Sequence, residues 1–167
     1  TGRNRHQFTR LFAIQNPTRI KPDNQPLVGT KFQVESVYQN FAPYPNSIIL
    51  REQEATATLT MEQVRSAHCV HFCCHGSFNF ASPLESALHL AESEDKLGAD
   101  ADLNLGEIFA NLSLEQCRLV TFSACETGIT DPKSISDEYI GLLSGFLYAG
   151  SPSIISTLWN VDQAATN

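Results

Sequence analysis

The sequence lacks any apolar run long enough to cross a membrane. Its longest apolar stretches, such as residues 153–159, fall well short of the ~20 residues that a membrane-spanning helix needs. The N-terminal residues also lack the apolar core of a signal peptide. We therefore expect a protein that is neither inserted into a membrane nor exported.

Cysteine is present, but without the spacing of a disulfide framework or a zinc site. There is no Cys-x-x-Cys pair, and neighbouring strand residues point to opposite faces, so the cysteines near His71 and His75 do not predict a metal site. We expect a reducing, cytoplasmic environment, free thiols, no metal and no cofactor. The five cysteines are Cys69, Cys73, Cys74, Cys117 and Cys125.

Positive charge is scarce as well. With 11 Lys and Arg against 18 Asp and Glu, the net charge of −7 argues against nucleic-acid binding, which needs a basic face. The glycine motifs that cradle nucleotide phosphates are absent. Residues 141–145 also fail the Gly-x-Ser-x-Gly spacing of a serine-hydrolase turn. Nucleotide-binding and serine-hydrolase functions are therefore disfavoured.

What the sequence does contain is a series of short apolar runs. They lack period-two polarity, as is typical of strands covered on both faces. A further short strand or hairpin arm is expected around residues 86–90. The predicted buried strands span residues 11–15, 47–50, 69–74, 119–122 and 153–158.

Helical patterns separate these strands. Thr60 is the expected cap of the second helix, and Ser136 and Gly150 flank the fourth. The predicted helices span residues 31–41, 61–67, 105–111 and 137–149, and Asp162 opens another that the sequence cuts off. Alternating strands and helices predict the α/β class, with a mostly parallel sheet and helices on both faces. We expect one domain over residues 1–167, truncated at its C-terminus.

Two residues suited to thiol catalysis follow two of these strands. His75 comes directly after the strand over 69–74, and Cys125 follows the strand over 119–122. In parallel sheets such strand ends share one edge, where sites form. Cys125 is then a candidate nucleophile and His75 a candidate proton carrier. The backbone N–H groups of Gly76 and Cys125 are candidate oxyanion-hole donors.

Five segments together resemble the CHAT domain, the caspase-like domain found with tetratricopeptide repeats, and more distantly separase. They are residues 71–76 (HFCCHG), 123–128 (SACETG), 137–142, 146–150 and 157–159. The resemblance covers about residues 10–167, and the 50 positions from His75 to Cys125 agree with the spacing in caspases. It implies a caspase-like three-layer sandwich.

The resemblance also implies a function. His75 becomes the general acid and base and Cys125 the nucleophile of a His/Cys dyad, which hydrolyses peptide bonds of a protein substrate. Related chains carry helical repeats that recruit or regulate, and no such repeat occurs in this sequence. A tetratricopeptide-repeat region or a regulatory protein is therefore an expected partner. A catalytically silent signalling or scaffold domain remains the alternative.

The nucleophile segment departs from that of true caspases. Glu126 follows Cys125 where caspases have Arg, Gln or Gly, so a preference for aspartate is not expected. Trp159, Asn160 and Asp162 follow the strand that builds the specificity pocket in the family. Asp162 is a candidate partner for a basic substrate side chain, although helix capping is the interpretation we favour.

Overall fold

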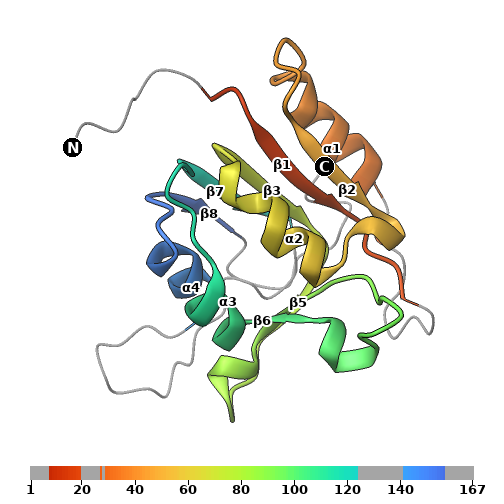
Figure 1. Ribbon diagram of the computed structural model, residues 1–167, viewed down its shortest axis with the longest axis vertical. Helices are drawn as coiled ribbons and strands as arrows, with labels where there is room; N and C mark the ends of the chain where they lie inside the picture. The colour runs from red at the N-terminus through yellow and green to blue at the C-terminus, as the bar shows by residue number, and fades with distance from the viewer. Residues whose placement is uncertain (1–7, 20–26, 28, 124–140, 157–167) are drawn as a thin grey trace.

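The described strands of the central sheet are all parallel. The computed structural model of the chain describes residues 8–19, 27, 29–123 and 141–156. Five strands pair in the order β2-β1-β3-β7-β8 (Figure 1). Their bounds are β1 Leu11–Gln15, β2 Ile48–Arg51, β3 Cys69–Cys73, β7 Leu119–Phe122 and β8 Ile154–Ile155.

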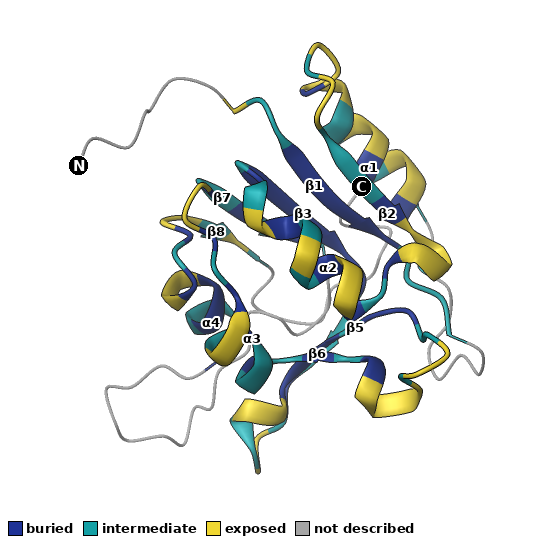
Figure 2. Cartoon of the chain, in the orientation of Figure 1, coloured by how far each residue is buried: buried dark blue, intermediate teal, exposed yellow. Residues whose placement is uncertain are grey.

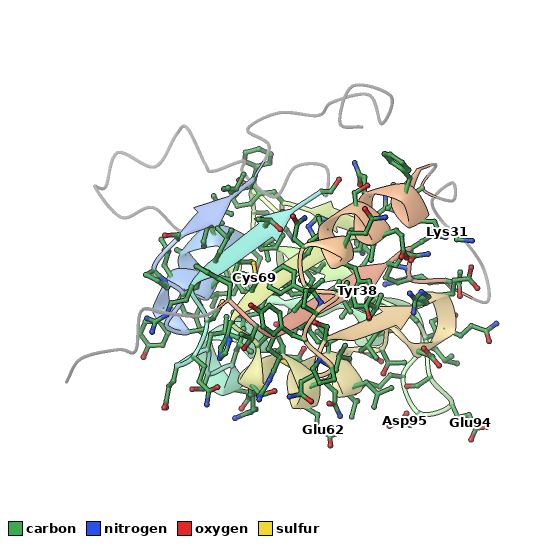
Figure 3. The ribbon with its side chains drawn as sticks, turned by 90° about the horizontal axis from the view of Figure 1, so that it is seen from above. Lys31, Tyr38, Glu62, Cys69, Glu94 and Asp95 are labelled. Atoms are coloured by element: carbon green, nitrogen blue, oxygen red, sulfur yellow. The ribbon has the colours of Figure 1, made fainter. Side chains whose placement is uncertain are left out.

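Helices cover both faces of this sheet. On one face α1 (Thr30–Gln39) packs Val34 against a core that includes Leu11 and Ala13. On the other face, α2 (Ala57–Gln63), α3 (Leu105–Asn111) and α4 (Leu142–Tyr148) contribute to a larger core. Figure 3 shows α1, with Lys31 and Tyr38, and Glu62 of α2 on opposite sides of the sheet. The predicted three-layer α/β architecture is confirmed.

The two cores follow from alternation along the strands. In β1, Leu11 and Ala13 face α1, whereas Phe12 and Ile14 face the larger core. Burying both faces explains why these runs are apolar without a polar alternation. Figure 2 shows that the buried residues concentrate in the central strands and that the outer sides of α1 and α2 are exposed.

A second, smaller sheet is antiparallel. It consists of β4 (His75–Ser77), β5 (Ala87–His89) and β6 (Leu103–Asn104), in that order. Leu88 and Leu103 face the larger core and join the two sheets. Short 3-10 turns connect the elements: η1 Glu52–Glu54, η2 Val64–Ser66, η3 Pro83–Glu85 and η4 Gly98–Ala101.

Several predicted boundaries need correction. The second helix begins at Ala57, because the Thr56 hydroxyl accepts the Leu59 N–H at 3.3 Å, whereas the predicted cap Thr60 is buried inside that helix. Its last residues form η2. The third strand ends at Cys73. Within the described residues the fourth helix spans Leu142–Tyr148, and residues 137–140 and the helix expected at Asp162 lie outside them.

None of the helices that the structure describes has the length and apolar character needed to cross a bilayer.

Candidate active site

The neighbouring strands β3 and β7 end at the same edge of the sheet. They are parallel, and Phe72 pairs with Phe122 at their ends. The Ser123 N–H extends this pairing by donating to the Phe72 carbonyl at 2.8 Å. In the sequence, His75 is three residues after Phe72, and Cys125 is three residues after Phe122. In the sequence, the two predicted residues therefore follow the same ends of two adjacent parallel strands.

The structure describes two of the predicted site residues. His75 is the first residue of β4 and is partly buried, and Gly76 follows it. Gly76 lies opposite Leu88 in the antiparallel pairing, and Leu88 is fully buried. The other predicted site residues lie outside the described part of the chain: Cys125, Trp159, Asn160 and Asp162.

A glutamine of α1 links the ends of β3 and β7. The Gln33 Oε1 atom accepts the Ser123 hydroxyl at 2.9 Å and the Cys73 thiol at 3.1 Å. Ser123 is two residues before Cys125 in the sequence. These hydrogen bonds connect α1 to the end of β7, which precedes the candidate nucleophile in the sequence.

The four described cysteines are free and buried, and they are poor nucleophiles. Burial raises the pKa of Cys69 and that of Cys73 to about 11. Burial also raises the pKa of Cys74, well above its usual value, and that of Cys117. Since the thiolate is the reactive form, these side chains are inert thiols near neutral pH. Of the five cysteines, only Cys125 remains as a candidate nucleophile.

A second histidine, His71, is buried in the middle of β3, on the face that α1 covers. Its Nδ1 atom lies 2.7 Å from the Thr121 hydroxyl, and its Nε2 atom has no hydrogen-bond partner among the described residues. Burial lowers its pKa to about 4, so it is neutral at physiological pH. Within the same residues, no group of three His, Cys, Asp or Glu side chains is placed to hold a metal ion.

Sequence reasoning missed an ion-pair cluster beside His75. The His89 Nδ1 atom lies 3.0 Å from Asp102 Oδ1, and the same oxygen pairs with the guanidinium of Arg19. The sequence suggested no partner for His89. Its position between Leu88 and Leu90 does indicate that it faces away from the core, but its pairing with Asp102 depends on the register of β5 and β6, which no local pattern encodes.

A family model of the CHAT domain matches residues 3–167. The chain belongs to the CHAT domain family. CHAT domains are related to the caspase-like cysteine peptidases, and the parallel sheet between two helical layers agrees with that relationship. No curated protein gives a significant match to this CHAT domain.

Proposed function

We propose that this CHAT domain is a cysteine endopeptidase that cleaves a protein substrate with a His75/Cys125 dyad. The observation that carries the proposal is the pairing of β3 with β7. His75 and Cys125 each follow, by three residues, one member of the Phe72–Phe122 pair at the sheet edge where sites form in parallel sheets. Membership of a peptidase-related family supports the same chemistry.

The reaction assigns one role to each residue. His75 takes the proton of the Cys125 thiol, and the thiolate sulfur attacks the substrate carbonyl carbon. The N–H groups of Gly76 and Cys125 donate to the resulting oxyanion. His75 then gives the proton to the departing amine as the C–N bond breaks and a thioester remains. Water, deprotonated by His75, hydrolyses the thioester and releases the free thiol.

The segment after β8 supplies the proposed contacts to the substrate side chain. Trp159, Asn160 and Asp162 line the specificity pocket in this proposal, and the carboxylate of Asp162 pairs with a basic side chain. If Asp162 instead caps a helix, its substitution alters stability and leaves the cleavage-site preference unchanged.

The proposed peptidase acts in the cytoplasm, together with a protein partner. The absence of a disulfide framework and the four buried free thiols suit the reducing cytoplasm. A tetratricopeptide-repeat region or a regulatory protein brings the substrate to the domain in this proposal. No membrane or nucleic-acid partner is included.

Cleavage of a peptide library by the full chain tests the proposal, with products identified by mass spectrometry. We expect Cys125→Ala to abolish cleavage and His75→Ala to lower its rate by at least about 100-fold, since general acid–base catalysis contributes about that much. Cys69→Ala is the matched control, because Cys69 is a buried thiol at the opposite end of β3 from His75. Cys69→Ala should cleave the library at the same rate as the unchanged chain.

A thiol-reactive peptide probe separates the peptidase from the silent scaffold. The probe should modify Cys125 in the unchanged chain, not in Cys125→Ala, and more slowly in His75→Ala. A folded chain, with its repeat region or partner added, that neither cleaves the library nor reacts with the probe would favour the scaffold.

A further inference from the structure

The three strands of the small sheet align three titratable side chains in one row. His75 of β4 pairs with His89 of β5. The register of β5 with β6, in which Leu88 pairs with Leu103, brings Asp102 opposite His89 when continued by one residue. Directly opposed residues share a face, with Cβ atoms about 4.5–5.5 Å apart. His75, His89 and Asp102 therefore lie side by side on the face opposite to that of Leu88 and Leu103, which face the larger core.

Contacts with each other and with Arg19 hold Asp102 and His89, two of the three side chains in this row, in place. Asp102 Oδ1 contacts both His89 Nδ1, at 3.0 Å, and the Arg19 guanidinium. Arg19 is itself fixed by the carbonyls of Leu90 at 3.2 Å and Gly98 at 3.0 Å. The side chains of Arg19, Asp102 and His89 are only 13%, 12% and 23% exposed. Three separate chain segments thus fix the His89 ring.

The contact with Asp102 favours the tautomer of His89 that can accept a hydrogen bond from His75. A carboxylate at Nδ1 favours the tautomer that carries its proton on Nδ1, and the Nε2 atom then becomes a hydrogen-bond acceptor. Arg19 balances the charge of Asp102, so the carboxylate is paired on both sides.

We propose that His89 is a positioning residue for His75. Its Nε2 atom accepts a hydrogen bond from one ring nitrogen of His75, and this bond turns the other nitrogen toward the nucleophile. Arg19 and Asp102 act through His89, as the orienting member does in other nucleophile–base–orienter arrangements. The catalytic consequence rests on the proposed peptidase function, whereas the contact between the two imidazoles does not.

Two matched substitutions of His89 separate positioning from structural support. The Gln side chain can replace the Nε2 acceptor directed at His75, whereas the shorter Asn side chain can replace only the Nδ1 donor directed at Asp102. We expect His89→Asn to lower kcat about 10- to 100-fold with little change in KM, and His89→Gln to retain most of the activity. A purely structural role predicts the reverse order. Asp100→Asn is the control, since Asp100 is exposed and two residues from Asp102.

Imidazole ¹⁵N NMR of the full chain at pH 8 measures the same coupling without turnover. The His75 signals, assigned with His75→Gln, should report one tautomer in the unchanged chain and in His89→Gln, and a mixture in His89→Asn and Asp102→Asn. Identical His75 signals in all these proteins would overturn the proposal, even if the chain cleaves peptides. A change in His75 tautomer in a chain that cleaves nothing would keep the positioning contact and reject the peptidase function.

Discussion

At the residue scale, the most unusual side chain of the described core is the buried imidazole of His71. It lies in β3 between the sheet and α1, with Thr121 as its hydrogen-bond partner. Burial holds its pKa at about 4, against 6.5 for an ordinary histidine. The folded protein therefore leaves His71 unprotonated over a range of pH in which the unfolded chain binds a proton.

This difference predicts an acid sensitivity of the fold. The unfolded state binds more protons than the folded state between about pH 6.5 and pH 4, so the free energy of unfolding falls as the pH is lowered through that range. The contribution of His71 is about 3 kcal/mol when the whole range has been crossed. Urea unfolding at several pH values measures it.

A pair of variants assigns the acid sensitivity to His71. In His71→Gln the free energy of unfolding should depend less on pH across this range. His68→Gln is the matched control, because His68 is less buried and its pKa is also lowered; it should keep most of the dependence. Parallel curves for the unchanged chain and His71→Gln would show that His71 does not titrate as described.

At the element scale, α3 and α4 approach each other through a glycine. A Cβ atom added at Gly145 of α4 would lie 2.5 Å from Leu105 Cδ1 and 2.9 Å from Ile108 Cγ2, both in α3. The leucine methyl can move, but the Ile108 methyl is attached to a branched Cβ atom and has less freedom. The close packing of the two helices therefore requires glycine at this position.

Gly145→Ala should destabilise the protein, although alanine is the better helix former by about 1 kcal/mol. Crowding against Ile108 costs about 1–3 kcal/mol, so the net loss in the free energy of unfolding should be as large as about 2 kcal/mol. Leu147→Ala, in the same helix but 52% exposed, should change it far less. A Gly145→Ala protein as stable as the original would mean that the two helices are less tightly packed.

Local sequence patterns predicted those elements whose signals are contiguous. The strands over 11–15 and 119–122 and the helix over 105–111 match β1, β7 and α3 at both ends. Of the small sheet, β5 matches the short strand expected around residues 86–90. The strands β4 and β6 were not predicted, because they have only 3 and 2 residues. The alignment of His75 with His89 depends on the pairing of strands that are separated in the sequence. The contact of His89 with Asp102 depends on the same pairing. The strand ends that lead to the candidate dyad were predictable, but the cluster beside it was not.

At the scale of the whole molecule, the free thiols are divided between the two cores. Cys69 and Cys73 belong to the core beneath α1, and Cys74 and Cys117 belong to the larger core on the opposite face of the sheet. Reagents can reach all four only when the layers separate. The fold therefore protects the described cysteines and leaves the proposed reactivity to Cys125.

The rate of iodoacetamide alkylation at each cysteine of the folded chain, followed by peptide mass spectrometry at neutral pH, tests the proposed dyad most directly. Cys125 should react at least about tenfold faster than any of the four buried thiols, because a nearby imidazole increases its thiolate fraction. Its rate should fall in His75→Gln and stay unchanged in His68→Gln. A Cys125 that reacts as slowly as the buried thiols, or equally fast without His75, would contradict the assignment of His75 and Cys125 as a catalytic pair.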